Sequence, residues 1–388
     1  MYRIGKEEID AVARVIESKK LFKINTGLQE SENAEIDMKA KFGTEHAILM
    51  TSGHAALTAA LVALGVGPGD QVIVPAYTYI STALAVVAAG AIPVIAEVDE
   101  TLTISPEDIE KKITKHTKAI MPVHIQGFPC NMDAIMAIAK KHGLYVVEDA
   151  CQADGGKYKG KTLGTIGDAG AYSFNYFKVI SCGEGGALLT NNQKVFERAF
   201  IYHDSAAVAF FGNQLDGFDE EMFAGNEYRT NEINAAILRC QLKRLDGIVA
   251  DLKRNRDRIK AKIAGKLNVI PSNDAEGGIP STLAVRFDTV EKTQRFCELS
   301  GRPSPINTGK HIYCNWTAIM NKKGAFNPLM DPFKMEANKD IIPDYSGDMC
   351  PKTLDLLART AYLLINPEWT EEECDAYAEQ NIAAFEQL

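Results

Sequence analysis

The fold of this chain is decided by one stretch, His46-Ala-Ile-Leu-Met-Thr-Ser-Gly-His-Ala-Ala-Leu57. Its first residues, His46–Met50, form the apolar run of a buried strand, and the apolar pattern of 55–64 predicts a helix. Thr51, Ser52 and Gly53 lie between the two as a tight turn. A strand that leads through a short turn into a helix is typical of α/β folds, in which helices connect parallel strands.

The same alternation continues to residue 190. Further strands are predicted at 71–75, 92–96, 119–123, 144–147, 170–174 and 186–190, and further helices at 7–17, 79–89 and 132–142. Because the strands are almost continuously apolar, we predict an α/β fold with a mostly parallel central sheet covered by helices on both faces. In the first helix, Ile9, Val12 and Val15 are expected to form the buried face.

The pattern changes after about residue 245. A long charged helix at 242–263 and a strand at 281–287 precede an irregular Gly/Pro/Asn-rich segment at 301–344, and helices at 351–362 and 370–385 close the chain. We therefore predict a large domain over residues 1–250 and a smaller α+β domain over residues 251–388.

Composition and charge exclude several classes of function. The chain has 388 residues, is 46% hydrophobic, and carries a net charge of −9 without any basic block, so neither nucleic acid nor a membrane is an expected partner. It begins with charged residues, and its most apolar stretch, 83–98, is broken by Gly90 and Pro93. Without a signal or membrane segment, the protein is expected to be cytoplasmic.

The cysteines and histidines do not indicate a metal site. The eight cysteines are scattered without a Cys-x-x-Cys pair, which favours reduced thiols over disulfides. The seven histidines show no His-x-His or His-x-x-x-His spacing. We predict no bound metal.

Three segments carry residues that can do chemistry. Ser52 and Gly53 lie where a helix begins, so that unpaired backbone N–H groups could bind a phosphate, although many such turns are purely structural. Glu148-Asp149 closes an apolar strand, where α/β sheets bind ligands; we favour Asp149, while an acid that caps the next helix remains an alternative. Lys178 follows a strand among Phe174, Tyr176, Phe177, Val179 and Ile180, and that apolar environment could activate its amine unless it is a surface lysine.

Pyridoxal phosphate needs a phosphate-binding turn, a carboxylate and a lysine amine. The three segments offer all of these, each at the end of a strand of one sheet. These segments and several others closely resemble the DegT/DnrJ/EryC1/StrS sugar aminotransferases, which share the aspartate-aminotransferase fold (fold type I). The further matching segments are 69–79, 121–127, 167–174 and 225–232, in family order between about residues 5 and 245.

The resemblance implies a role for each matching residue. Lys178 corresponds to the lysine that holds pyridoxal phosphate as an imine, and Asp149 to the acid beside the pyridine nitrogen. The remaining cofactor contacts implied are Gln152 near the ring hydroxyl, Tyr79 stacked on the ring, and Ser52, Gly53 and Ser173 at the phosphate. Asn226 corresponds to a residue that reaches the phosphate of a neighbouring subunit, which implies a homodimer with shared sites.

The chain also departs from the family pattern. His54 stands where the family usually has threonine, so its contact could be the phosphate or the substrate. His203-Asp204 replaces the usual His-Gly, and an apolar loop at 206–218 follows. Segments 308–316 and 344–352 are unusual and indicate substrate loops. In the first, Lys310 and His311 are candidates for contacts with an anionic sugar, while solvated loop charges remain an equal alternative. His203 is a further candidate for a substrate contact. For His124 a hydrogen-bonded structural role is favoured.

The function implied is transamination in amino-sugar biosynthesis. An amino acid, expected to be L-glutamate, would supply the amino group, and a keto or aldehydo sugar, often nucleotide-linked, would accept it. An acceptor such as a keto cyclitol, a Kdo-like acid sugar or a non-sugar carbonyl compound remains an alternative. Dehydratases of this fold have histidine in place of the lysine, so Lys178 argues against dehydration. A cofactor-binding regulator would need a DNA-binding segment, and the sequence offers none.

Overall fold

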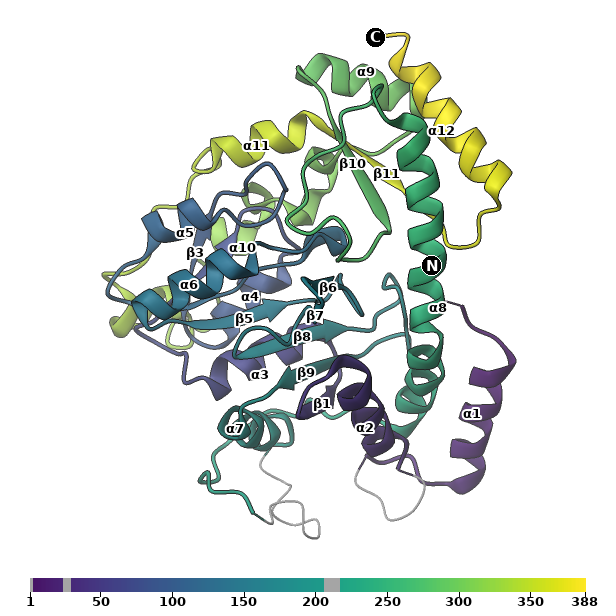
Figure 1. The fold of residues 1–388 in the computed structure, drawn as a ribbon. Coiled ribbons are helices and arrows are strands. Elements are labelled where there is room, and N and C mark those ends of the chain that lie inside the picture. The colour runs from purple at the N-terminus through teal and green to yellow at the C-terminus, as the bar shows by residue number, and fades with distance from the viewer. Residues whose placement is uncertain (1–2, 24–28, 206–216) are drawn as a thin grey trace.

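The computed structural model describes residues 3–23, 29–205 and 217–388 (Figure 1). The helices are α1 (Lys6–Ser18), α2 (Glu30–Phe42), α3 (Gly53–Ala63), α4 (Ser81–Ala88), α5 (Pro106–Lys112), α6 (Met132–His142), α7 (Gln193–His203), α8 (Glu232–Ile263), α9 (Val290–Ser300), α10 (Thr317–Met320), α11 (Pro351–Ala358) and α12 (Glu371–Phe385). The strands are β1 (His46–Met50), β2 (Gln71–Pro75), β3 (Ile92–Ala96), β4 (Thr117–Ile120), β5 (Tyr145–Asp149), β6 (Lys157–Tyr158), β7 (Lys161–Thr162), β8 (Ala169–Ser173), β9 (Gly186–Thr190), β10 (Thr282–Arg286) and β11 (Thr360–Leu364).

The central sheet has seven strands in the order β1-β9-β8-β5-β4-β2-β3 (Figure 1). β9 is antiparallel to both of its neighbours, whereas the pairs from β8 through β5, β4 and β2 to β3 are parallel. This confirms the predicted α/β fold with a mostly parallel sheet. β10 and β11 form a separate antiparallel pair.

Helices cover both faces of the sheet, as the strand patterns predicted. In β2 the side chain of Ile73 belongs to one apolar cluster, and those of Val72 and Val74 belong to the other. The first cluster includes residues of α2, α6 and α8, and the second includes residues of α3, α4 and α7. Because successive side chains of a strand point to opposite faces, a strand that is apolar throughout requires cover on both sides.

Three strands that run in the same direction, β1, β5 and β8, have their carboxyl ends at the same end of the sheet. Gly186, the first residue of β9, pairs with Met50 at the end of β1 and with Ser173 at the end of β8. Asp149 at the end of β5 pairs with Ala171 of β8. The three chemical segments of the sequence therefore end side by side.

Some predicted elements differ from the structure. α8 begins at Glu232 rather than at residue 242, and the helix predicted at 351–362 ends at Ala358, after which Thr360–Leu364 form β11. This strand exists because it pairs with β10, a long-range contact that overrides local helix preference. In α1 the buried apolar residues are Ala11 and Val15, while Ile9 is 63% exposed.

The boundary predicted near residue 250 falls inside α8, which runs without a break from Glu232 to Ile263 (Figure 1). Its first half packs against α1 and α2, and α12 also lies along it. Part of the C-terminal segment returns to the large domain: Tyr345 donates a hydrogen bond to the carbonyl of Pro93 (2.6 Å), and the backbone N–H of Tyr313 donates to Ala76 (3.0 Å). The division into two domains thus remains a prediction.

Asn338 fastens this returning segment to the sheet. Its side chain is fully buried; Oδ1 accepts the backbone N–H of Gly69 (2.6 Å), and Nδ2 donates to the carbonyls of Gly90 (3.0 Å) and Pro332 (2.8 Å). One amide therefore satisfies three backbone groups at once, of which the carbonyl of Pro332 is buried and those of Gly69 and Gly90 are half-buried.

We expect Asn338→Ala to lower the free energy of unfolding by roughly 3 kcal/mol, because three backbone groups, one buried and two half-buried, lose their partner. Urea unfolding followed by circular dichroism would measure this. The exposed Asn321 provides the matched control: Asn321→Ala should change the free energy by less than about 0.5 kcal/mol. Equal effects of the two substitutions would contradict the role given to Asn338.

Candidate active site

A cavity lies where the parallel strands of the sheet have their carboxyl ends, and it consists of two adjoining parts. Both parts are lined by Tyr79, Gln152, Asn175, Lys178 and Glu184. The smaller part, about 230 Å³, is also lined by Ser52, Gly53, His54, Asp149 and Ser173. The larger part, about 570 Å³, is also lined by Gln126, Phe177, Ser281, Lys310 and His311. Most of the predicted site residues therefore share one cavity.

The turn before α3 leaves its backbone open to the smaller part. Ser52 caps the helix, since its Oγ accepts the backbone N–H of Ala55 (3.1 Å). A side chain at Gly53 would place its Cβ 2.6 Å from Cys151 Sγ and 2.9 Å from Ser173 Cβ, and one at Gly186 would place it 2.2 Å from the carbonyl carbon of Ser52. Glycine is required at both positions because the segments pass so close to each other.

His54 lies in the smaller part beside this turn. Burial lowers the pKa of its imidazole, although a hydrogen bond with the Ser81 backbone opposes this. Its Nδ1 atom is buried, and within the described ranges it has no hydrogen-bond partner. A neutral ring with an unsatisfied nitrogen can still bind a ligand atom that enters the cavity.

Asp149 is held in place by neighbours on both carboxylate oxygens. Its Oδ2 accepts a hydrogen bond from the Thr82 hydroxyl (2.8 Å), and its Oδ1 accepts the backbone N–H of Cys151 (3.2 Å). Thr82 in turn shares a hydrogen bond with Thr78 (2.7 Å between hydroxyl oxygens). No sequence pattern points to Thr82, because its contact with Asp149 depends on how α4 lies beside the end of β5.

Glu148, the neighbouring acid, has a different role. It is fully buried, and its carboxylate accepts the backbone N–H groups of Gly164 (2.9 Å), Ile166 (2.6 Å) and Gly167 (2.7 Å). Nε2 of His124 lies 3.0 Å from Glu148 Oε2, and Nδ1 of that ring accepts the N–H of Cys130 (3.1 Å). These residues order the loop behind β5, whereas Asp149 lines the cavity.

Lys178 lies in the segment that connects β8 to β9 and lines both parts of the cavity. Its backbone N–H donates to the carbonyl of Asn175 (3.1 Å). The apolar environment predicted for it is only partly present. Phe174 and Ile180 are fully buried, but Tyr176 is 64% and Phe177 77% exposed.

The segment that carries Tyr79 is joined to Lys310 and His311, which are far away in the sequence. The backbone N–H groups of Thr78 and Ile80 donate to the carbonyls of His311 (2.9 Å) and Lys310 (3.1 Å). Lys310 Nζ lies 4.9 Å from the centroid of the Tyr79 ring, a distance typical of a cation–π contact, and the His311 ring lies 5.5 Å away. Burial lowers the pKa of His311, and the charges of Lys310 and Lys178 lower it further. A hydrogen bond with the backbone of Thr308 opposes this shift.

Gln152 is oriented by Gln126, a residue that the sequence did not single out. Gln152 Oε1 accepts the backbone N–H of Gln126 (2.9 Å), whose own side chain accepts the Thr282 hydroxyl (3.2 Å). Gln126 has a positive φ of 54°, which is unusual for a residue other than glycine. The cavity is thereby linked to β10.

Two predicted site residues lie elsewhere. His203 is buried at the end of α7; its Nδ1 donates to the carbonyl of Phe200 (2.5 Å), and its Nε2 lies 3.2 Å from Lys23 Nζ. Both ring nitrogens are thus engaged, and burial, together with the charge of Lys23, holds the pKa of His203 well below its usual value. His203 is not among the residues that line the cavity. Asn226 is exposed and donates to the Tyr202 hydroxyl (2.7 Å). Most of the loop predicted at 206–218 lies outside the described residues.

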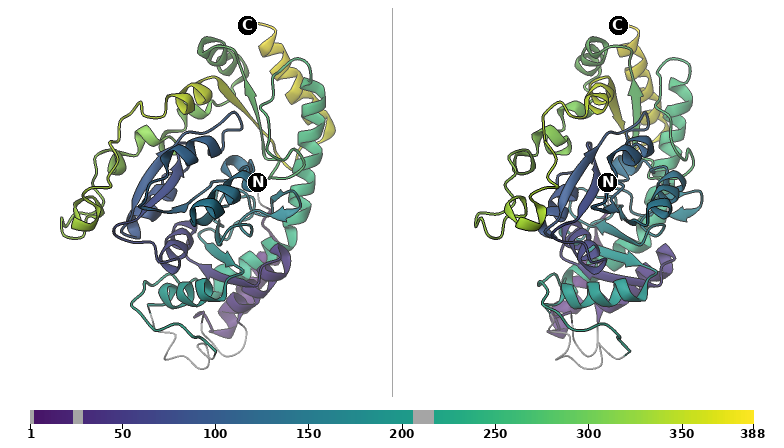
Figure 2. Two further views of the ribbon diagram at one scale, coloured as in Figure 1. Left: turned by 60° about the vertical axis from the view of Figure 1, so that its left-hand side comes forward. Right: turned by 90° about the vertical axis from the view of Figure 1, so that its left-hand side faces the viewer.

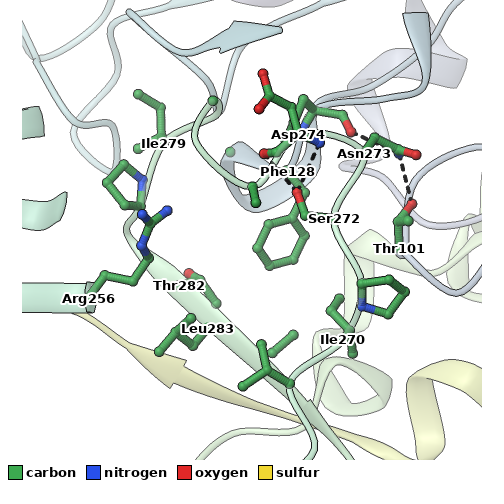
Figure 3. A pocket seen from close by; sticks show the side chains of 18 of the residues that line it. Thr101, Phe128, Arg256, Ile270, Ser272, Asn273, Asp274, Ile279, Thr282 and Leu283 are labelled. Atoms are coloured by element: carbon green, nitrogen blue, oxygen red, sulfur yellow. Dashed lines mark hydrogen bonds between the residues drawn. The ribbon is translucent and has the colours of Figure 1, made fainter. Parts of the chain in front are cut away.

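A smaller hollow of about 70 Å³ lies between α8, β10 and the segment around Phe128 (Figure 3). Asn273 donates here to the Thr101 hydroxyl (3.2 Å) and to the carbonyl of Pro129 (3.0 Å), so the wall joins the C-terminal segment to the large domain. None of the predicted site residues lines this hollow. Within residues 3–23, 29–205 and 217–388, no group of side chains suits a metal ion.

Comparisons with known proteins identify the family of the chain. The profile of the DegT/DnrJ/EryC1/StrS aminotransferase family matches residues 2–294. The chain belongs to this family. The spore coat polysaccharide biosynthesis protein SpsC of Bacillus subtilis (strain 168) is 39% identical over 273 residues, which cover 69% of this chain and 68% of that protein.

Solved structures agree as well. The crystal structure of 3-amino-5-hydroxybenzoic acid (AHBA) synthase has a TM-score of 0.81 at 27% identity and covers 100% of this chain and 98% of its own. The aminotransferase from Psychrobacter cryohalolentis has a TM-score of 0.80 at 30% identity, with the same coverage. The chain is thus a pyridoxal phosphate-dependent aminotransferase of fold type I.

The residues of the cavity fit pyridoxal phosphate. The cofactor needs donors for its phosphate, an acid for its pyridine nitrogen and a lysine amine. The open backbone at Gly53 and the unsatisfied nitrogen of His54 suit the phosphate, and Asp149 and Lys178 line the same cavity.

We expect Gly186→Ala to weaken binding of pyridoxal phosphate by at least about tenfold, because the added methyl group displaces the Ser52–Gly53 backbone. Titration of the apoprotein, followed by visible absorbance, would measure this. Gly247→Ala is the matched control, since the structure has nothing within 4 Å of the new methyl group. Unchanged affinity in Gly186→Ala would show that the turn does not position the cofactor.

Proposed function

We propose that this aminotransferase moves an amino group from L-glutamate to a keto or aldehydo sugar, often nucleotide-linked, in amino-sugar biosynthesis. The observation that carries the proposal is the meeting of Lys178, Asp149 and the Ser52–Gly53 turn in one cavity. SpsC, by its name, belongs to polysaccharide biosynthesis, which supports a sugar as the acceptor.

Each residue has a distinct role in this proposal. Pyridoxal phosphate, when bound, supplies the electron sink that amino-group transfer requires. Asp149, oriented by Thr82 and the N–H of Cys151, holds a proton at the pyridine nitrogen. Lys178 anchors the cofactor; once displaced, its amine removes the proton from the α-carbon of the donor and later returns one to the carbon of the acceptor.

The remaining residues bind and orient. Ser52, Gly53, His54 and Ser173 hold the phosphate, Tyr79 stacks on the ring, and Gln152 contacts its hydroxyl group. Lys310 and His311 line the larger part of the cavity, where the substrate would enter, and we assign them to substrate binding. We do not assign His203 to it, because both of its ring nitrogens are engaged within the chain.

A non-sugar acceptor is the second candidate. AHBA synthase, which is named after an amino-hydroxybenzoic acid, has this fold over the whole chain. The larger part of the cavity is about 570 Å³, enough for a ligand of either class. Incubating the glutamate-treated enzyme with keto sugars, keto cyclitols and cyclic keto acids would separate the two, since only a true acceptor restores the original absorption band.

We propose a cytoplasmic homodimer in which each cavity is completed by its partner. Asn226 does not line the cavity of its own chain, and Tyr176 and Phe177 expose large apolar surfaces beside Lys178. Exposed aromatic residues next to a site are typical of an interface. In the described part of the chain, no helix has the length and apolar character needed to cross a bilayer.

We expect Lys178→Ala to abolish the visible absorption band of the bound cofactor and to lower the rate of the half-reaction with glutamate by at least about a thousandfold. Spectrophotometry with and without glutamate would measure both. The exposed Lys157, changed to alanine, should leave both unchanged. Formation of 2-oxoglutarate at an undiminished rate by Lys178→Ala would refute the assignment.

Mixed dimers would test the shared site. Asn226→Asp should be inactive alone, because its charge repels the partner's cofactor phosphate, and Lys178→Ala should be inactive for the reason above. Unfolded together and refolded in equal amounts, the two should recover about a quarter of wild-type activity, since half of the dimers carry one intact site. No recovery, with each variant folded and dimeric, would place Asn226 in its own chain's site.

A further inference from the structure

Glu184 is an acid of the cavity to which the proposed mechanism gives no part. It lines both the smaller and the larger part, as Lys178, Asn175 and Gln152 do. The residue is exposed, and in the part of the chain that the structure describes, its carboxylate forms no ion pair and no hydrogen bond. An ionised carboxylate only accepts hydrogen bonds, so both oxygens of Glu184 are available to donors on a ligand.

The backbone of Glu184 is held in place. Its carbonyl accepts hydrogen bonds from Asn234 Nδ2 (2.7 Å) and from Cys182 Sγ (3.4 Å). Asn234 belongs to α8, the long teal-green helix that in both views of Figure 2 runs from the purple N-terminal helices toward the yellow C-terminal helix. The next residue, Gly185, packs tightly, since a Cβ there would lie 2.6 Å from Cys182 Sγ. A side chain on a fixed backbone can bind a ligand in a defined orientation.

The other residues of the larger part suit a ligand that is rich in hydroxyl groups. They include three amides, one hydroxyl and two aromatic rings: Gln126, Gln152, Asn175, Ser281, Tyr79 and Phe177. Amide groups both donate and accept hydrogen bonds, as hydroxyl groups do, and a carboxylate can accept from two neighbouring hydroxyl groups at once. Glu184 adds a charged acceptor, whose hydrogen bonds are stronger than those of neutral groups.

Two substrates must use this cavity in turn. L-Glutamate, the proposed donor, carries two carboxylates, and Lys310 offers a cation for one of them. A carboxylate placed beside Glu184 would be repelled, whereas a neutral hydroxyl group would be bound without that cost. The acid therefore favours an acceptor with hydroxyl groups over one that carries a carboxylate in this position.

We propose that Glu184 determines the choice of acceptor by binding two hydroxyl groups of a polyhydroxylated ring, such as a keto sugar or a keto cyclitol. The inference rests on the proposed function, because it takes the larger part of the cavity as the acceptor site. Glu184 binds and orients this ring, while Lys178 carries out the proton transfer. A cyclic keto acid without such hydroxyl groups would instead bring a charge that Glu184 repels.

The test compares carbonyl compounds on the glutamate-treated holoenzyme, by the rate at which each restores the original absorption band. The hydroxylated probes are a nucleotide-linked keto hexose and a keto-inositol, and the probe without hydroxyl groups is 2-oxoglutarate, which carries two carboxylates. We expect Glu184→Ala to raise the half-saturating concentration of the accepted hydroxylated probe at least about tenfold, because two charge-assisted hydrogen bonds are lost. With 2-oxoglutarate the half-saturating concentration should stay unchanged or fall, since a repelling charge is removed.

Two further variants complete the comparison. Glu184→Gln keeps the shape of the side chain and one hydrogen-bond acceptor, so its effect on the hydroxylated probe should be smaller than that of Glu184→Ala. Glu45 is an exposed acid that lines neither part of the cavity, and Glu45→Ala should match wild type with every probe.

The outcomes separate this inference from the proposed function. An equal loss with 2-oxoglutarate would show a general structural role of Glu184 and overturn the inference. An unchanged response of Glu184→Ala to the hydroxylated probe would overturn it too, and both results leave the proposed function intact. If neither hydroxylated probe restores the band of wild type, although 2-oxoglutarate does, the polyhydroxylated acceptor itself is wrong, and the inference and the proposed function fall together.

Discussion

The close packing of β9 against the Ser52–Gly53 turn is the constraint on which the site depends. Gly186 pairs with the last residues of β1 and β8, and no side chain fits between it and Ser52. The segment that carries Lys178 leaves β8 at Ser173 and returns at Gly186, so both of its ends are fixed beside the turn. One backbone contact thus sets the position of the proposed phosphate site relative to the amine of Lys178.

The smaller part of the cavity contains little positive charge. Among the described residues that line it, Lys178 is the one cation, and burial keeps the pKa of His54 below its usual value. A doubly charged phosphate bound here as proposed would draw mainly on helix N–H groups, hydroxyl groups and the dipole of α3 within its own chain. The larger part is lined by Lys310 as well as Lys178, so a second cation lies where the substrate would enter.

Sequence reasoning located the strands and the residues at their ends, because these depend on local patterns of apolar residues. It favoured Asp149 over Glu148 for the cavity, and the structure has Asp149 in the cavity wall and Glu148 binding the backbone of 164–167. It could not identify Thr82 or Gln126, whose roles come from contacts between elements distant in sequence. β11 was missed for the same reason. The contact between His203 and Lys23 could not be predicted either, because Lys23 is far away in the chain.

The unbroken course of α8 through residue 250 has a consequence for exchanging parts between relatives. The helix packs against α1 and α2 in its first half and against α12 as well, so it belongs to the cores of both parts of the molecule. A chimera joined at that point would inherit half of each set of packing contacts from the wrong parent. If Lys310 and His311 bind the substrate as proposed, grafting the short segment around them would avoid this cut. The graft would have to keep its backbone hydrogen bonds to the large domain and the buried side chains of Ile312 and Tyr313.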